Sequence, residues 1–467
     1  MISYYYSSDE GLNLIKSLLV LKGHKLYSEI WSDQPPVFTY IVSYFINLFG
    51  FDEGLLRILI NIFSLIIVLG VGEIVSDIIS KYHQRDDYKV RLISYLFAFI
   101  FVPLINNYLK FSNAIMIGIP CLSFGVLGAV FFQKRKLSKI YYFLSAFFLS
   151  LSVFTKFFGI LIAFGLAFAE IIESLLSKRF SEVMKELLIF AAICAGISLV
   201  VLSILTPELF ENFYSNLLSG HLKHSKTSFF STGDKLIRRL DNIKTILRST
   251  TLLFVVGLFF NRLRLYILPL SLLLFNFIVF ANHKPIWEHH YYFIYFPFAI
   301  LAAVVFSSFA LSFNSLEKIK RDKKEMVAFC IFILSLSFLL WKAPGAIKGQ
   351  YKKLVKNSTK MNPVVVELIK NNSTNEYVFT DMPLYAIAAG KLVPPEIAVL
   401  SWKRVSSMGN KKVAKLYMEL SEKYPGSLFY FHRYPELKRN IAELLESKYE
   451  CIDPDNRCRV WREKPKG

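Results

Sequence analysis

Charged residues are scarce in this chain, at 19% of its 467 residues, against about 25% in an average soluble domain. Hydrophobic residues make up 54% and aromatic residues 16%, and the mean hydropathy is +0.42. A soluble globular protein of this length would be more polar. The composition therefore excludes that class and favours a membrane protein.

Acidic residues are fewer than basic ones, with 35 Asp and Glu against 55 Lys and Arg, which gives a net charge of +20. The lysines and arginines stand in short clusters between apolar runs rather than in one basic stripe. Such clusters suit the anionic headgroups of a lipid bilayer better than nucleic acid. We expect a lipid bilayer as a partner and no nucleic acid.

We expect no cleavable signal peptide, because the chain does not open on a basic segment followed by a short apolar core. We therefore expect the apolar spans themselves to direct insertion. There is no internal repeat and no low-complexity tract.

Only five cysteines occur, and they fall into two groups. Cys121, Cys194 and Cys330 lie in apolar segments, where a thiol behaves as a small hydrophobic group. Cys451 and Cys458 flank a turn signal at 453–456. A disulfide between them is consistent with an oxidising compartment, and two unpaired thiols are the equally open alternative.

Long apolar runs dominate what is present. Ten are close to the ~20 residues that a helix needs to cross a bilayer, and they occupy 54–80, 92–110, 114–132, 140–155, 159–177, 188–206, 249–261, 265–282, 292–312 and 326–343. The run 249–261 is the weakest of these because it is short. The amphipathic stretch 11–22 and the short run 37–49 after Pro35 and Pro36 predict helices that lie in the membrane interface.

The distribution of basic residues predicts the orientation. With the N-terminus outside, eighteen Lys and Arg fall in the inner loops at 81–91, 133–139, 178–187, 261–264 and 313–325, whereas the short outer connections hold only Lys110, Lys156 and Lys284. The positive-inside rule favours this orientation. Residues 1–53, the 207–248 loop, the 282–290 turn and everything after 344 then share the extracytoplasmic face of the plasma membrane.

The composition changes after 345. Strand-like and helix-like pieces alternate, at 377–380, 410–423, 427–431 and 435–448, which predicts a small α/β domain. The predicted fold is mainly α, with about ten spans and interfacial helices. Its parts are an outer first loop at 1–53, a multi-span domain at 54–344, a lysine-rich linker at 345–361 and an extracytoplasmic α/β domain at 362–467.

Three polar segments could carry chemistry on the outer face. Asp9 and Glu10 open the first interfacial helix, where a carboxylate can act as general base on an acceptor hydroxyl. Alternatively, they are a solvated pair that the helix N-terminus favours. Asp33 and Gln34 precede Pro35 and Pro36, and His289, His290 and Tyr291 stand at the outer mouth of a span.

These segments resemble a known family. The string Asp9-Glu10-Gly11, the series Gly23, Tyr27, Trp31, Asp33, Pro35, Pro36, and the triplet Arg57-Ile58-Leu59 are similar to the first outer loop of glycosyltransferase family 39-type enzymes. These are the protein O-mannosyltransferases and aminoarabinose transferases of the multi-pass C architecture. Supporting matches are Thr155-Lys156-Phe157, His290-Tyr291-Tyr292 before Phe296-Pro297, Thr380-Asp381-Met382-Pro383 and Pro394-Pro395. The resemblance covers most of 1–345 and, more loosely, 360–460.

The resemblance implies an inverting transfer of a monosaccharide from a polyprenyl- or dolichyl-phosphate donor. The acceptor, a protein, lipid or glycan, would attack from the outer side. Asp9 would be the base with Glu10 in support, and a basic residue would neutralise the leaving phosphate.

The sequence departs from the family in two places. Only eight residues precede the acidic pair, where the family has a membrane span. The position before Pro35, usually cationic in the family, is Gln34, so the cation that binds the phosphate must lie elsewhere. Candidates are Arg57, Lys156, Arg238, Arg239, Lys284, His289 and His290. Lys156 is equally well explained as a lysine that snorkels to the interface, Arg57 as a helix anchor, and Arg238 and Arg239 as contacts to lipid headgroups.

No metal or other cofactor is predicted, although a divalent cation is left open. His289 and His290 are adjacent and would point in different directions on a helix, whereas His221 and His224 would share a helical face. Two other functions are considered. A transporter or flippase of lipid-linked substrates would show charges at mid-span or paired halves, which this sequence lacks. A non-catalytic scaffold leaves the clustered outer carboxylates, histidines and lysine without a role.

Overall fold

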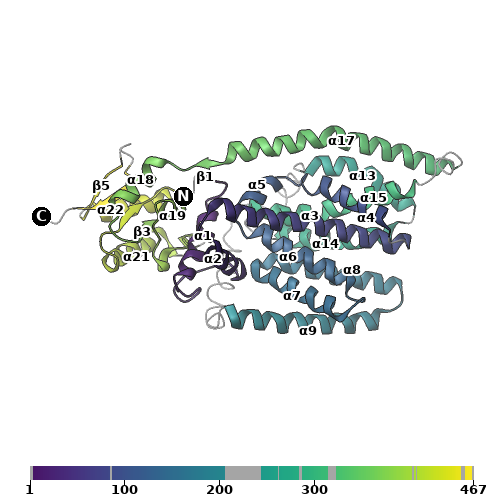
Figure 1. Cartoon of the computed structure of the whole chain (residues 1–467), viewed down its shortest axis with the longest axis horizontal. Helices are drawn as coiled ribbons and strands as arrows, with labels where there is room; N and C mark the ends of the chain where they lie inside the picture. Colours follow the sequence, from purple (N-terminus) through teal and green to yellow (C-terminus); the bar gives the residue numbers. More distant parts are fainter. Residues whose placement is uncertain are drawn as a thin grey trace.

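The computed structural model describes residues 4–84, 87–205, 243–260, 262–282, 287–313, 322–401, 404–405, 408–446, 448–453 and 458–464. Long helices form one body, and a small domain that contains a sheet lies at one end of it (Figure 1). Helices α1 and α2 lie between these two parts (Figure 1).

The two short N-terminal helices form where the amphipathic pattern predicts them. Helix α1 (Asp9–Leu21) begins with Asp9 and Glu10 in its first turn, which the helix dipole favours. Helix α2 (Val37–Phe49) begins directly after Pro36 and ends at Gly50. Gly50 has φ 76°, a left-handed conformation that glycine adopts at low cost. The prediction of a helix at 37–49 is confirmed.

Each of the ten predicted apolar runs falls on a helix. They are α3 (Glu53–His83), α4 (Tyr88–Phe101), α6 (Gly118–Lys134), α7 (Lys139–Thr155), α8 (Ile160–Leu176), α9 (Phe180–Leu205), α13 (Lys244–Phe259), α14 (Leu263–Asn282), α15 (Tyr291–Ser312) and α17 (Lys323–Asn357). Within the described residues, six of these are long and apolar enough to cross a membrane: α3, α8, α9, α14, α15 and α17. The chain is a multi-pass membrane protein.

Two helices differ in extent from their predicted runs. The run 92–110 is interrupted: α4 ends at Phe101, near Pro103, which has no N–H to donate. A separate short helix, α5 (Tyr108–Asn113), follows. Helix α17 passes through Pro344 without ending, so most of the lysine-rich linker at 345–361 is helical. In Figure 1, α17 extends from the long helices toward the small domain.

The segments predicted to be outer loops meet at one end of the helices. Lys110 Nζ lies 2.9 Å from Glu288 Oε2, and Gln350 Nε2 donates to the Pro103 carbonyl over 2.7 Å. Contacts at 2.7 Å between Arg135 Nη2 and Glu170 Oε2, and at 2.8 Å between Arg262 Nη1 and Ser308 Oγ, join the predicted inner loops 133–139 and 261–264 to α8 and α15. The orientation of these two ends relative to the membrane stays a prediction.

The C-terminal domain contains a four-stranded mixed sheet in the order β3-β4-β6-β5. Strand β3 (Val378–Thr380) is parallel to β4 (Leu428–Tyr430), which pairs antiparallel with β6 (Val460–Glu463), and β6 pairs antiparallel with β5 (Tyr449–Cys451). Helices α18 (Pro363–Asn372), α19 (Pro383–Ala388), α21 (Asn410–Lys423) and α22 (Pro435–Leu445) accompany the sheet. The predicted alternation of strands and helices is confirmed.

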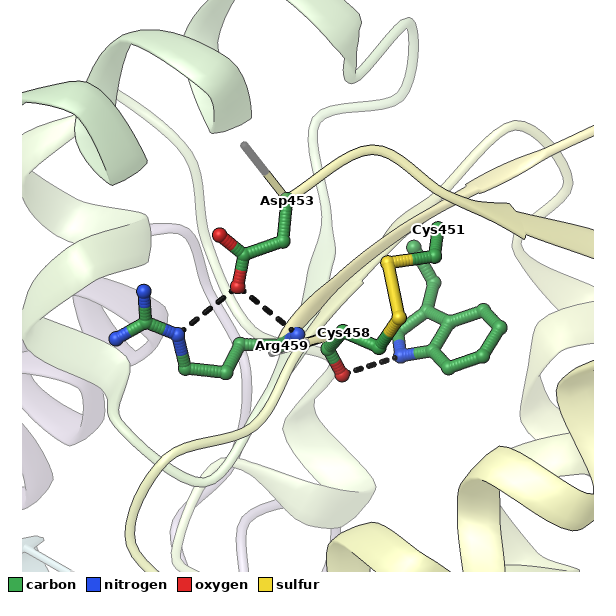
Figure 2. Close-up of a disulfide and its surroundings, with 5 residues drawn as sticks. Cys451, Asp453, Cys458 and Arg459 are labelled. Atoms are coloured by element: carbon green, nitrogen blue, oxygen red, sulfur yellow. Dashed lines mark hydrogen bonds and ion pairs between the residues drawn. A yellow bond between two sulfur atoms is a disulfide. The ribbon is translucent and has the colours of Figure 1, made fainter. Parts of the chain in front are cut away.

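Cys451 and Cys458 form the disulfide that the sequence left open. Their Cα atoms are 5.4 Å apart, at the end where β5 and β6 meet. Figure 2 shows that Asp453 lies beside the bridge and accepts hydrogen bonds from the backbone N–H and Nε of Arg459. The bridge and this ion pair together close the turn between the two strands.

The C-terminal domain packs directly on the N-terminal segment. The N-terminal strand β1 (Tyr4–Tyr5) pairs antiparallel with β2 (Thr359–Lys360), immediately after α17. Lys22 Nζ lies 2.6 Å from Glu376 Oε1. A Cβ added to Gly11 would be 2.8 Å from Leu384 Cγ and 2.9 Å from its backbone nitrogen, so α1 and α19 approach closely because residue 11 is glycine.

Candidate active site

Helix α1 carries the two adjacent carboxylates into different surroundings. Asp9 is partly exposed, with 37% of its side chain accessible, and its Oδ1 lies 3.0 Å from Nη2 of Arg433 in the C-terminal domain. Glu10, in contrast, is 1% exposed. Only Asp9 therefore keeps access to an incoming molecule.

Glu10 is the centre of a buried network. Its Oε1 accepts the N–H of Tyr6 (2.7 Å) and Ser7 (3.1 Å), and its Oε2 accepts Nη1 of Arg57 (3.1 Å) and the N–H of Ile115 (3.2 Å). Burial raises the pKa of Glu10, while Arg57 and the backbone amides oppose this rise. All four partners are donors, so they stabilise the carboxylate.

The guanidinium nitrogens of Arg57 all donate hydrogen bonds within the same network. Its Nε and Nη2 donate to Glu53 Oε1 over 3.0 and 2.8 Å, and its Nη1 also donates to the Asn113 carbonyl. Protein groups thus already neutralise Arg57, which makes it a poor candidate for the phosphate cation.

Lys16 stands two helical turns after Asp9 and is 2% exposed. Within the described part of the chain, its ammonium group forms no hydrogen bond and no ion pair. Burial lowers the pKa of Lys16 to about 8, and the nearby charges of Asp33 and Asp9 oppose the shift. A buried ammonium group without a direct partner is costly, which makes Lys16 suited to bind an anion.

The first loop is rigidly folded before the Pro-Pro pair. Tyr27 is buried, adopts φ 77° and donates its hydroxyl to the Gln34 carbonyl over 2.7 Å. Ser32 Oγ donates to the same carbonyl over 3.1 Å. The left-handed conformation is uncommon for a bulky residue. These bonds fix the backbone at Asp33 and Gln34. Asp33 lies near enough to Lys16 for its charge to oppose the fall in the pKa of Lys16.

A second cluster joins Lys156 to the histidine-bearing turn. Lys156 is buried, and its Nζ lies 5.3 Å from the ring centroid of Phe158 and 5.7 Å from that of Phe293. The His290 ring meets the same Phe158 ring at 4.9 Å, and His289 lies 4.5 Å from His290. Tyr291 is buried against Tyr295 at 5.7 Å. Lys156 and His290 are therefore neighbours around Phe158, and His289 lies beside His290.

The segment 113–121 connects the two clusters. Asn13 Nδ2 of α1 donates to the Ile115 carbonyl over 3.2 Å. Three residues later, a Cβ on Gly118 would be 2.7 Å from the Tyr292 ring, and Cys121 Sγ is 3.5 Å from the Lys156 carbonyl. The Asp9 and Lys156 clusters thus lie at opposite ends of one short segment, at the same end of the helices.

Some predicted residues cannot be placed. Lys284, Arg238, Arg239, His221 and His224 lie outside the described residues. Among the residues that are described, no group of three or more His, Cys, Asp or Glu side chains could hold a metal ion.

Sequence reasoning missed Lys16 and Arg433. Lys16 lies within an amphipathic stretch, where it resembles an ordinary surface lysine, although its spacing of seven residues from Asp9 places both on one face. Arg433 follows a strand of a different domain, 424 residues away from Asp9. Nothing in the local sequence signals that contact.

Comparisons with known proteins give a similarity of fold. No family model and no curated protein matches the sequence. ArnT from Cupriavidus metallidurans, in a crystal structure bound to undecaprenyl phosphate, superposes with a TM-score of 0.66 at 11% identity, over 99% of this chain and 94% of that chain. The archaeal oligosaccharyltransferase AglB from Archaeoglobus fulgidus gives a TM-score of 0.49 at 13% identity, over 82% and 55% of the two chains. The chain has the GT-C glycosyltransferase fold.

Proposed function

We propose that this chain, which has the GT-C fold, transfers a monosaccharide from a polyprenyl- or dolichyl-phosphate donor to an acceptor at the extracytoplasmic face, with inversion. The observation that carries the proposal is the arrangement on α1. An accessible carboxylate, Asp9, lies two turns from Lys16, a buried ammonium that has no direct partner among the described residues. A base and an anion-binding cation on one helix are the two groups that such a transfer requires.

In the proposed reaction, Asp9 accepts the proton of the acceptor hydroxyl as its oxygen attacks the anomeric carbon. The bond between that carbon and the phosphate oxygen breaks, and its electron pair leaves with the lipid phosphate. Because attack occurs opposite the leaving group, the anomeric configuration inverts. Arg433 already occupies Oδ1 of Asp9, which leaves Oδ2 for the proton.

The leaving phosphate gains one negative charge during this step, so a fixed cation stabilises the transition state more than the bound donor. We assign this role to Lys16. It would replace the cation that the resembled family usually has before the Pro-Pro pair, where this chain has Gln34. Lys156, with His289 and His290 beside it, is the second candidate and would hold the donor from the other side of segment 113–121. The bound lipid phosphate of ArnT supports a donor of this class.

Glu10 and Arg57 receive a structural role in this proposal. Their side chains are 1% and 7% exposed, and their polar atoms are engaged with one another, with Glu53 and with backbone groups. They hold the start of α1 against α3 and segment 113–121, and so place Asp9.

The test is a transfer assay with purified protein, a radiolabelled polyprenyl-phosphate sugar and membrane extract as the source of acceptor. We expect label to move to the extract with the wild type, and Asp9→Asn to lower the rate by about 10²–10⁴-fold, the usual worth of a general base. Asp52→Asn is the matched control. Asp52 is an exposed carboxylate that caps α3 through Leu55 N–H, and asparagine caps equally well.

Full transfer activity in Asp9→Asn would reject the assignment of the base. Movement of the labelled donor across proteoliposomes without transfer would replace the proposed function with a flippase.

A further inference from the structure

We infer that Arg433 of the C-terminal domain belongs to the active site, where one terminal nitrogen orients Asp9 and the other binds an oxygen atom of the acceptor. This inference rests on the proposed function. Its first observation is the contact itself: Nη2 of Arg433 is 3.0 Å from Oδ1 of Asp9, and both side chains are partly buried. A guanidinium group in this position restricts the carboxylate to one orientation.

The loop that carries Arg433 is held by hydrogen bonds to one buried carboxylate. Asp381, which follows β3 and is fully buried, accepts the backbone N–H groups of His432 (2.9 Å), Arg433 (2.8 Å) and Tyr434 (2.8 Å). Burial raises the pKa of Asp381, and the three amides oppose the rise. Three amide donors on one carboxylate hold the loop 432–434 at the end of the sheet.

The domain that holds this loop is itself held against α1. Gly11, two residues after Asp9, touches Leu384, three residues after Asp381. Lys22 at the far end of α1 pairs with Glu376, just before β3. The position of Arg433 relative to Asp9 is therefore set from both sides, by the Asp381 clamp and by the contact between α1 and α19.

The second observation points to a ligand. Nη1 of Arg433 is buried and has no hydrogen-bond partner among the described residues. The guanidinium lies 5.3 Å from the Tyr434 ring, which covers it without supplying an acceptor. A buried donor left unsatisfied costs free energy. Because Nη1 shares a carbon with the nitrogen that binds Asp9, an oxygen bound there would lie next to the hydroxyl that Asp9 deprotonates.

The chemistry of the expected ligand follows from the donor. Arginine has no acceptor atom, so the group at Nη1 must be a hydrogen-bond acceptor, such as a carboxylate, phosphate, carbonyl or sugar oxygen next to the attacking hydroxyl. The site is then complete only when the C-terminal domain is in place. We assign this domain a direct part in acceptor binding.

The experiment uses the full-length protein and the transfer assay above, with membrane extract titrated as the acceptor pool. Arg433→Ala should lower kcat/KM for the acceptor pool by about 100-fold, as misplacement of a catalytic group does, and leave the KM of the donor within about twofold. Millimolar guanidinium should restore part of the activity of Arg433→Ala. Arg433→Lys should remain impaired, because one ammonium does not replace a planar fork.

Arg439→Ala is the control, since Arg439 is an exposed arginine of the same domain, and it should behave as the wild type. The inference is overturned if Arg433→Ala keeps wild-type constants, or if its loss of activity follows a lower Tm and guanidinium restores none of it. These outcomes leave the proposed function intact as long as Asp9→Asn is inactive, so the two failures are distinguishable.

Discussion

At the scale of single residues, the two acids in the first turn of α1 have different roles in this proposal: Glu10 holds the helix in position, and Asp9 takes part in the reaction. Glu10 buries its carboxylate among four donors, and Asp9 leaves one carboxylate oxygen available beside Arg433. The adjacent acids therefore have opposite requirements. Loss of Glu10 should weaken the structure, whereas loss of Asp9 should stop the reaction without unfolding the protein.

Glu10→Gln should lower the free energy of unfolding by roughly 3 kcal/mol, because it leaves Arg57 as a buried charge with one partner fewer. The measurement is thermal unfolding of the detergent-solubilised protein. Glu288→Gln, at a half-exposed ion pair with Lys110, should cost less than about 1 kcal/mol. A Glu10→Gln protein that is as stable as the wild type but inactive would instead make Glu10 a catalytic residue.

Lys16 gives the reaction a pH dependence of definite sign. Since burial lowers its pKa to about 8, the free enzyme loses this positive charge above that pH, and kcat/KM for the donor should then fall about tenfold per pH unit. In Lys16→Arg the charge persists at every accessible pH, and the alkaline fall should disappear. An identical alkaline limb in both proteins would show that Lys16 does not bind the donor phosphate.

Unfolding does not explain such a fall. An unfolded lysine keeps its proton to about pH 10.4, so between pH 8 and that value the unfolded chain binds more protons at this site than the folded one. The stability contributed by Lys16 therefore rises with pH across this window. Loss of activity above pH 8 would accompany a more stable protein, which thermal unfolding at the same pH values can confirm.

At the scale of elements, the contact between α1 and α19 positions Asp9 relative to the C-terminal domain. Gly11→Ala should disturb this contact, since the new Cβ would meet both the side chain and the backbone nitrogen of Leu384 at under 3.0 Å. We expect a loss of roughly 1–3 kcal/mol, typical of overpacking, and lower transfer activity. Leu384→Ala should rescue only part of it, because the backbone clash remains.

Gly349→Ala in α17 is the control, because a Cβ there has no neighbour within 4 Å. Alanine favours a helix over glycine by up to about 1 kcal/mol, so this variant should be unchanged or slightly more stable. Equal effects of the two substitutions on Tm and activity would contradict a specific role for the close contact at Gly11.

Most helices could be predicted because residues within or beside them determine where they begin and end. The Pro-Pro pair and Gly50 bound α2, and the polar periodicity of 410–423 gives α21 with the same bounds. The interruption after Phe101 was missed, since the apolar run continues past it and only Pro103 marks the change. The extension of α17 past Pro344 was missed for the opposite reason: its lysine-rich composition resembles a linker, although lysine is a good helix former.

At the scale of the whole molecule, the candidate site combines groups that no local pattern relates. The acidic pair alone did not single out Asp9, and the resemblance of the first loop to a known family led to its prediction as the base. Its partner Arg433 could not be predicted, because their contact depends on how a distant domain docks. Burial decides the roles of Glu10, Arg57 and Lys16, and burial of a charged residue depends on its three-dimensional neighbours rather than on its sequence neighbours.

The orientation in the membrane is the central claim of this account, because the proposed function requires the donor phosphate, Asp9 and the C-terminal domain to meet outside the cell. Single cysteines at exposed positions, in a background with Cys330→Ser, can be labelled with a membrane-impermeant maleimide on intact cells. Ser28→Cys in the first loop and Lys411→Cys in the C-terminal domain should react on intact cells, and Lys136→Cys and Ser177→Cys only after permeabilisation. Labelling of Lys136→Cys on intact cells with Ser28→Cys protected would place the site in the cytoplasm and contradict the account.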